Sequence, residues 1–360
     1  MLTAIFFFIG GLLILILGAE FLLRGSSRLA AAFGISPLVI GLTIVAIGTA
    51  SPEIAVSLQA AVNGQGDLTL GNVLGSNIFN ILFILGMTAM VAPIIIAEQL
   101  IRLDAPIMLA VSLLVLALAL DGNLALLDSL ILLVCLVGYT VFALRQSRRE
   151  SQKVQNEYAE EYAAKQRPTT KNTAINLLLI AAGLGLLVAG SRWLVDSAVS
   201  IARMLRVSEL IIGLTIVAVG TSLPEVTTSL MAALKKQSDI AVGNAVGSNI
   251  FNLLGDLGIR AILAPGGIPV SARVLQFDFL VMIFVALVSL PIFYLDNKIS
   301  RIEGALLLSY YFLYLVYIIL QATNSPVLPA LSWFAGIFVP MTFLALIAFA
   351  IRSARIKRRR

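Results

Sequence analysis

The sequence contains an internal repeat, which restricts the possible folds of the chain. Residues 35–93 align without a gap on residues 207–265, at a constant offset of 172 positions, and 33 of the 59 aligned residues are identical. Two unrelated apolar segments could match in composition, but they would not keep Gly, Pro, Glu and Asn in register. The chain is therefore expected to contain two equivalent halves.

Both copies lie among long apolar stretches. The chain is 59% hydrophobic and only 12% charged, whereas a soluble domain is about a quarter charged. Its apolar runs repeatedly reach the length of about 18 residues that spans a membrane. We therefore predict an all-α polytopic membrane protein with eleven spans, at about 3–22, 35–62, 68–92, 104–120, 124–144, 174–191, 207–234, 239–264, 276–295, 302–321 and 329–351.

The Lys and Arg residues predict the orientation. With the N-terminus outside, the inner side carries twenty Lys and Arg residues, and the outer side carries five, one of which is Arg260. Such an excess marks the cytoplasmic side. We therefore expect the N-terminus outside and the C-terminus inside, and no Lys or Arg in the central part of any span.

The spacing of the repeats predicts that they are inverted. The duplicated segments fall in spans 2–3 and 7–8, so equivalent spans are five apart in the chain. Because five is an odd number, the two copies cross the membrane in opposite directions. Inverted repeats usually place a transport site between them near the bilayer midplane. The expected divisions are a first repeat of spans 1–5 (1–144), a cytoplasmic linker (145–173), a second repeat of spans 6–10 (174–321), and an extra C-terminal span with a basic tail (322–360).

Each copy carries a Pro-Glu pair inside an apolar span, in GTASPE (48–53) and GTSLPE (220–225). Proline removes a backbone donor and breaks the helix, and an ionisable group at membrane depth indicates a functional site. We expect two broken helices that bring Glu53 and Glu225 together. The carbonyls of Ala46 and Ala218, six residues before each proline, are candidate ligands.

The helix after each motif adds further polar groups, in GNVLGSNIFN (71–80) and GNAVGSNIFN (243–252). Ser76 and Asn80 are four residues apart and share one helix face, as Ser248 and Asn252 do. Asn77 and Asn249 point elsewhere and are expected to bond between helices, while the glycines of these motifs are expected to serve close helix packing. The candidate oxygen ligands are Glu53, Glu225, Thr49, Ser51, Thr221, Ser222, Ser76, Asn80, Ser248 and Asn252.

Oxygen and amide ligands suit Na⁺, Ca²⁺, Mg²⁺ or Mn²⁺ rather than soft metals. The chain has no His and a single cysteine, Cys135, which excludes histidine proton relays, Cys clusters and an intramolecular disulfide. We expect no cofactor, no nucleic acid and no obligate protein partner, and membrane lipid as the surroundings.

The duplicated GTASPE/GNVLGSNIFN and GTSLPE/GNAVGSNIFN segments resemble the repeats of the sodium/calcium exchanger family, within the calcium:cation antiporter superfamily, and most of all its bacterial members. The resemblance implies ten spans in two inverted halves, with ions between spans 2, 3, 7 and 8. It implies that Glu53 and Glu225 bind Ca²⁺ and Na⁺ in alternation. By the same resemblance the further ion ligands are Thr49, Thr221, Ser222, Ser76, Asn80, Ser248 and Asn252.

Three positions depart from the family pattern. Ala50 stands where the motif usually has Ser, so one hydroxyl is missing, and Ser51 beside it faces elsewhere on the helix. Asn252 stands where many exchangers have Asp. Asp256 then follows one turn later, where the first copy has Ile84. Asp256 either restores the lost charge or pairs with Arg260 at i, i+4.

The predicted function is a secondary antiporter of the bacterial inner membrane that exports Ca²⁺ in exchange for Na⁺ by alternating access. The alternatives are H⁺ or K⁺ coupling on the same fold and, more remotely, a cation channel. An intramembrane protease with Asp256 and Asp296 as its pair is the enzyme alternative. Asp296, at a span end, argues against it.

Overall fold

The computed structural model describes residues 2–50, 53–54, 66–147, 170–206, 212, 215–216, 218–264 and 266–357. These residues are helical except for connecting turns and four two-residue strands. In chain order the helices are α1 Leu2–Phe33, α2 Pro37–Ile40, η1 Gly41–Val45, α3 Ala46–Thr49, α5 Gly66–Phe79, η2 Asn80–Leu85, α6 Gly86–Val91, η3 Leu100–Asp104, α7 Ala105–Ala119, α8 Leu126–Ser147, α10 Thr170–Met204, α12 Ala218–Gly220, α13 Leu223–Leu234, α14 Ser238–Phe251, η6 Asn252–Asp256, α15 Leu257–Leu263, η7 Val274–Asp278, α16 Phe279–Tyr294, α17 Arg301–Ala322 and α18 Leu328–Lys357, where η marks a π-helical turn.

Within the described ranges, eight helices are long and apolar enough to cross a membrane. They are α1, α5–η2–α6 from Thr69, η3–α7, α8, α10, η7–α16, α17 and α18 as far as Arg352. The predicted span at 239–264 is one further unbroken helix, α14–η6–α15. The prediction of an all-α membrane protein is confirmed, and the count of eleven spans stays a prediction.

The second copy contains the expected broken helix. After α12 the chain turns at Thr221 and Ser222, and α13 then begins with Pro224 in its first turn. Proline fits there because the first amides of a helix have no intrahelical acceptor. In the first copy, α3 ends at Thr49 and helical geometry is again described at Glu53.

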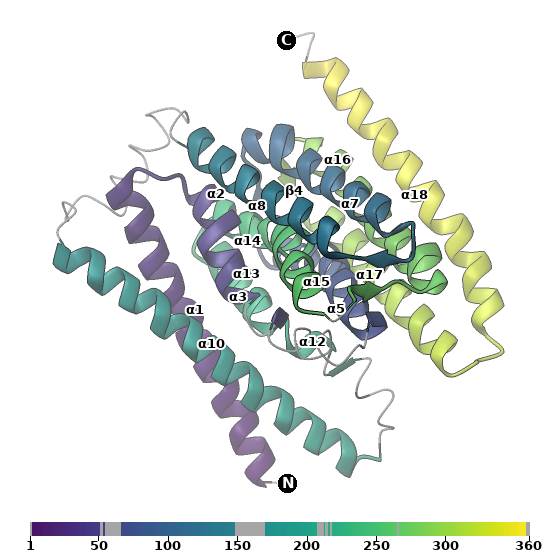
Figure 1. The fold of residues 1–360 in the computed structure, drawn as a ribbon, viewed down its shortest axis with the longest axis horizontal. Coiled ribbons are helices and arrows are strands. Elements are labelled where there is room, and N and C mark those ends of the chain that lie inside the picture. The colour runs from purple at the N-terminus through teal and green to yellow at the C-terminus, as the bar shows by residue number, and fades with distance from the viewer. Residues whose placement is uncertain are drawn as a thin grey trace.

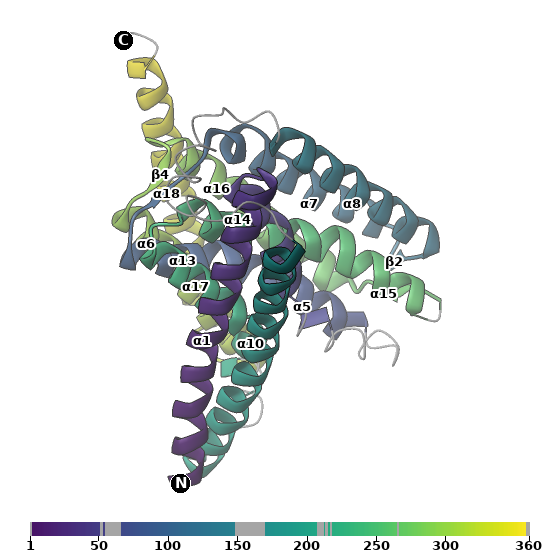
Figure 2. The same cartoon turned by 90° about the vertical axis from the view of Figure 1, so that its left-hand side faces the viewer.

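Helices α1 and α10 cross in contact and extend together away from the remaining helices (Figures 1 and 2). A Cβ added at Gly11 would lie 2.8 Å from the Gly190 carbonyl oxygen, and one at Gly18 would lie 2.9 Å from that of Gly183. As the residue numbers increase along α1, those of the contacting residues on α10 decrease, so the two helices run antiparallel. Glycines permit this backbone contact because they carry no side chain.

Helix α14 is the centre of the molecule, packed against α2–η1–α3, α13 and η2. A Cβ at Gly247 would lie 2.5 Å from the Leu42 Cα, and Gly243 meets the Leu38 carbonyl in the same way, so these glycines have the predicted packing role. A Cβ at Gly71 or Gly75 would meet no described atom within 4 Å, and for the first copy the packing role stays a prediction.

Two short antiparallel strand pairs join the halves. Strand β1 (Ile94–Ile95) pairs with β4 (Lys298–Ile299), and β2 (Asn123–Leu124) pairs with β3 (Ile268–Pro269). Each pair therefore joins a connection of the first copy to one of the second. Helix α18 lies along the edge of the molecule opposite α1 and α10 (Figure 1).

Candidate functional site

Glu53 lies at the contact between the two copies. Its side chain is buried, and its Oε1 accepts hydrogen bonds from Ser76 Oγ at 3.0 Å and from Ser222 Oγ. Ser76 belongs to the same copy and Ser222 to the other. Ser222 and Glu53 are 169 positions apart in the chain. Their hydrogen bond brings the two copies together at Glu53, as expected for a site between the repeats.

Glu225 has a poorer set of partners than Glu53. It is fully buried, and neither carboxylate oxygen has a hydrogen-bond partner among the described residues. The position equivalent to Ser222 in the first copy is Ala50, which is buried but has no hydroxyl to donate. When both carboxylates are ionised they repel each other, and a bound cation would relieve this repulsion.

A second group of polar side chains surrounds Thr49. Its hydroxyl lies 3.1 Å from Asn244 Oδ1 and also contacts the Val45 carbonyl. Asn244 Nδ2 in turn donates to Ser229 Oγ at 2.9 Å. These contacts join α3 to α14 and α13, so Thr49 is held against the second copy as Glu53 is.

The asparagines of the two copies behave as predicted for interhelical bonding. Asn80 Nδ2 donates to Asn249 Oδ1 at 2.9 Å, and Asn249 Nδ2 donates to the Asn77 carbonyl at 3.1 Å. Ser248 Oγ and both polar atoms of Asn252 are buried without a hydrogen-bond partner among the described residues. The oxygens of Ser248 and Asn252, with Asn80 Oδ1, remain able to bind a cation.

Asp256 pairs with Arg260, one of the two alternatives for this residue. Arg260 is completely buried and donates from Nη2 to the Glu53 carbonyl at 3.1 Å as well as binding the Asp256 carboxylate. The expectation of an outer-side Arg260, and of spans with no central Lys or Arg, is therefore wrong. The pair is tolerated because each buried charge has an oppositely charged neighbour.

The remaining candidates have different places. The Ala46 carbonyl accepts bonds from the Ala50 amide at 3.1 Å and from the Thr49 hydroxyl at 3.4 Å, so it is not freed as expected. Ala218 begins α12, and Thr221 lies in the turn between α12 and α13. Ser51 lies outside the described residues.

The buried, unpartnered oxygens explain what this cluster can do. Oxygen atoms without protein donors are costly in a dry interior, and a hard cation satisfies several of them at once. Among the described residues no group of three or more His, Cys, Asp or Glu residues has metal-site geometry, so neutral oxygens must complete a coordination shell. Such a mixed site suits reversible binding of Na⁺ or Ca²⁺.

Known proteins resemble this chain over most of its length. The family model described as sodium/calcium exchanger protein matches residues 3–145 and 175–320. The chain belongs to the sodium/calcium exchanger family. It is 40% identical over 312 residues to the putative antiporter CaxA of Alkalimonas amylolytica, covering 86% of this chain and 96% of that protein.

Two further relatives share most of the chain. The inner membrane protein YrbG of Escherichia coli K12 is 38% identical over 80% of this chain and 88% of its own. The exchanger NCX_Mj, in a structure soaked with zero Na⁺ and Ca²⁺, superimposes with a TM-score of 0.74 at 29% identity, covering 88% of this chain and 98% of that one. The chain is therefore an integral membrane protein of an ion-exchanger family.

The sequence analysis named Arg260 as a possible partner of Asp256 but did not place it beside Glu53, and it left Asn244 and Ser229 out of the candidate ligand set. The available signal for Arg260 was its position one turn after Asp256, on the helix that carries Ser248 and Asn252. Two opposite charges one turn apart can both remain inside a span if they neutralise each other. The predicted span 239–264 ends four residues after Arg260, and for this reason we expected Arg260 near the outer surface.

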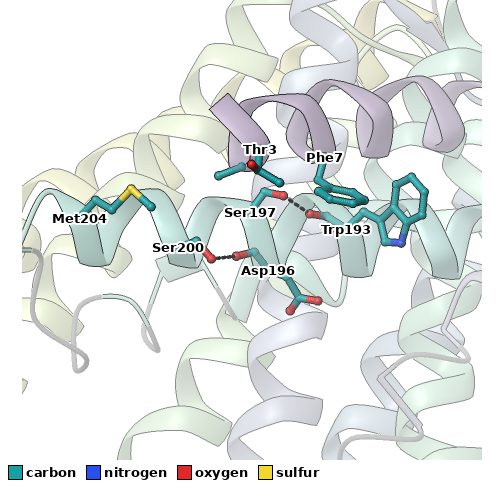
Figure 3. Close-up of a pocket in the computed structure, with 8 residues that line it drawn as sticks. Thr3, Phe7, Trp193, Asp196, Ser197, Ser200 and Met204 are labelled. Carbon is teal, nitrogen blue, oxygen red and sulfur yellow. Dashed lines mark hydrogen bonds between the residues drawn. The ribbon is translucent and has the colours of Figure 1, made fainter. Parts of the chain in front are cut away.

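A surface pocket lies away from this cluster, between the first residues of α1 and the last part of α10 (Figure 3). Phe7 and Trp193 pack edge to face in it with ring centroids 5.1 Å apart. The Ser197 and Ser200 hydroxyls bond back to carbonyls of their own helix, and Asp196 is exposed. The pocket has one carboxylate and lacks the convergent buried oxygens of the Glu53 cluster.

Proposed function

We propose that this protein is a secondary active antiporter that exchanges Na⁺ for Ca²⁺ by alternating access and exports Ca²⁺. The observation that carries the proposal is the buried contact of Ser222 with Glu53, within a cluster of unpartnered oxygens contributed by both copies. A site shared by two halves can open to either side when the halves exchange conformations. The names of the exchanger relatives support the same two ions.

Inverted five-helix halves are part of this proposal, with the N-terminus outside and the C-terminus inside. Supporting evidence comes from the antiparallel crossing of α1 and α10. Gly11 meets Gly190 and Gly18 meets Gly183. At the repeat offset of 172, Gly11 is equivalent to Gly183 and Gly18 is equivalent to Gly190. Each contact is therefore equivalent to the other, as a two-fold axis would require. The boundaries at 144, 173 and 321 follow from this division.

The proposed ion ligands include the buried oxygens that have no hydrogen-bond partner among the described residues. Glu53 and Glu225 supply the charge, and a bound Ca²⁺ or Na⁺ would take their free oxygens together with those of neighbouring hydroxyls and amides. The remaining proposed ligands are Thr49, Ser51, Thr221, Ser222, Ser76, Asn80, Ser248 and Asn252, with the carbonyl of Ala218. Asp256 is bound to Arg260, and this ion pair adds no net charge to the site.

Na⁺ coupling is preferred over H⁺ coupling because the cluster is rich in neutral oxygens. Hydroxyls and amides are Na⁺ ligands, whereas a proton needs only a carboxylate. By the same reasoning K⁺ coupling would use a larger set of these oxygens. The proposed location is a bacterial inner membrane, as the description of YrbG suggests. Exchange requires neither a cofactor nor an obligate protein partner in this scheme.

The test is Ca²⁺ uptake into proteoliposomes driven by a Na⁺ gradient, with Glu53→Gln and Glu225→Gln. Each variant removes a buried charge and is expected to weaken uptake at least ~30-fold. Glu98→Gln is the matched control, because Glu98 is 65% exposed and pairs with Arg102. It is expected to transport normally.

Full exchange by both site variants would contradict the proposal. Uptake driven by a pH gradient in Na⁺-free buffer would indicate H⁺ coupling, and a requirement for K⁺ would indicate K⁺ coupling. Flux that does not saturate and needs no counter-ion would indicate a channel. Asp296 is exposed and Asp256 is buried beside Arg260, which disfavours a protease pair.

A further inference from the structure

The ion pair of Asp256 and Arg260 is a charged element that the exchange scheme leaves without a role. The two residues lie one turn apart on η6–α15, and their side chains are 1% and 0% exposed. Arg260 Nη2 also donates to the Glu53 carbonyl at 3.1 Å. A guanidinium is therefore buried beside the Glu53 end of the candidate site.

The charges of this region form one connected set. Glu53 interacts electrostatically with Glu225, with Asp256 and with Arg260. With all three carboxylates ionised, the single guanidinium leaves two net negative charges. Because an uncompensated buried charge is costly, the bound ions must bring two positive charges, which one Ca²⁺ or two Na⁺ supply.

The pair belongs to one half only. The positions equivalent to Asp256 and Arg260 in the first copy are Ile84 and Thr88, and both are buried. Asp256 without Arg260 would give the site a third uncompensated carboxylate and hence a requirement for one more positive charge. An arginine meets that requirement permanently, since its guanidinium does not lose its proton in proteins.

Resting on the proposed exchange function, we propose that Arg260 is a tethered cation that takes the place of one monovalent ion in the site. The protein then needs two positive charges from its cargo instead of three. Arg260 Nε and Nη1 have no hydrogen-bond partner among the described residues, so the guanidinium is not enclosed in a complete structural network. It is a specificity-determining residue, which sets how many ions bind.

The test is Ca²⁺ self-exchange by the full-length protein in proteoliposomes, in choline medium with and without low concentrations of Na⁺, K⁺ or Li⁺. Wild type is expected to need none of them. Arg260→Gln leaves a third carboxylate charge, and its self-exchange is expected to be stimulated ~5- to 150-fold by a monovalent ion, the usual range for coupled binding. Its Na⁺ dependence in Na⁺/Ca²⁺ exchange should also become steeper.

Two variants separate charge from shape. Arg260→Lys keeps the positive charge, and the double variant Asp256→Asn/Arg260→Gln removes both charges and keeps the net charge of the site. Neither is expected to acquire the monovalent requirement. If the double variant acquires it as the single variant does, the effect comes from the lost shape of Arg260 and the proposal is wrong.

An Arg260→Gln protein that exchanges Ca²⁺ without monovalent stimulation and with unchanged Na⁺ steepness would also overturn the proposal. If that variant does not fold, wild type decides the question. Self-exchange that depends on a monovalent ion would contradict a tethered cation. Independence, with a Na⁺ Hill coefficient no higher than about two, would support it. Loss of Na⁺-driven uptake with intact Ca²⁺ self-exchange would overturn only the Na⁺ coupling.

Discussion

Glu53 and Glu225 are equivalent in the repeat, yet their surroundings differ, and one difference is a single hydroxyl oxygen. Glu53 receives the Ser222 hydroxyl, whereas Glu225 faces the half-site in which Ala50 replaces that serine. A hydrogen bond to a charged group contributes about 1.5–3 kcal/mol. The two half-sites should therefore differ in how strongly they hold a carboxylate and, through it, an ion.

The first prediction concerns this missing hydroxyl. Ala50→Ser adds an oxygen at the position equivalent to Ser222, and it should lower the Na⁺ concentration for half-maximal exchange by up to ~10-fold, as a net gain of ~0.5–1.5 kcal/mol implies. Ser222→Ala should raise it by ~10-fold or more. Both are measured as Na⁺-dependent Ca²⁺ flux in proteoliposomes.

Ser112→Ala is the control for these changes. Ser112 is buried, but its hydroxyl bonds back to the Met108 carbonyl at 2.8 Å within its own helix. Its removal should leave the Na⁺ dependence unchanged. An Ala50→Ser protein with wild-type Na⁺ dependence would show that this position does not face the ions.

Among the elements, the α1–α10 pair depends most directly on backbone contact. A Cβ at Gly18 would lie 2.8 Å from the Leu187 amide nitrogen and 2.9 Å from the Gly183 carbonyl oxygen. Backbone atoms cannot move aside as a flexible side chain can. The spacing of these two helices is thus determined by glycines rather than by interlocking large side chains.

We predict that Gly18→Val separates α1 from α10, lowers the melting temperature in detergent and reduces exchange. The destabilisation should be about 1–3 kcal/mol, as for other overpacked sites. Gly185→Ala is the control on α10, because a Cβ there meets no described atom within 4 Å. It should be neutral or slightly stabilising, since Ala favours a helix over Gly by about 1 kcal/mol. Equal effects of the two changes would contradict this packing model.

In the whole molecule, α18 is peripheral to the two halves. Only 6% of the residues in its most apolar 18-residue stretch are buried, and the family match ends at residue 320. It contacts the other helices through Phe343, whose ring lies 5.4 Å from that of Phe284, and through Thr342, which bonds to the Tyr310 hydroxyl. None of these residues lies in the Glu53 cluster.

Removal of residues 325–360 is therefore expected to leave Na⁺-driven Ca²⁺ exchange intact, with a melting temperature lower by a few degrees, as a loss of ~1 kcal/mol would produce. Truncation from residue 300 is the contrasting control. It also removes α17, whose Gly304 packs against the Gly86 carbonyl of α6. That protein should not fold. Loss of exchange in the shorter truncation would assign α18 a role in transport.

Much of the fold and of the site is predictable from sequence because the motifs of each repeat are short and can be interpreted one at a time. A Pro-Glu pair in an apolar span and a Ser–Asn pair four residues apart identify helix breaks and helix faces without knowledge of the rest of the chain. The broken helix at Thr221–Ser222 and the interhelical bonds of Asn249 follow these expectations. The hydrogen-bonded Ala46 carbonyl does not, because helix hydrogen bonding persists as far as Ala50.

Residue type and spacing along the chain are enough to identify the membrane helices, the repeat, the family and the two carboxylates. Which partner each carboxylate has depends instead on the packing of the folded chain. The Ser222–Glu53 bond and the burial of Arg260 against the Glu53 carbonyl join residues 169 and 207 positions apart. Their approach depends on how α13, α14 and α15 pack on the first copy, which helical periodicity cannot specify.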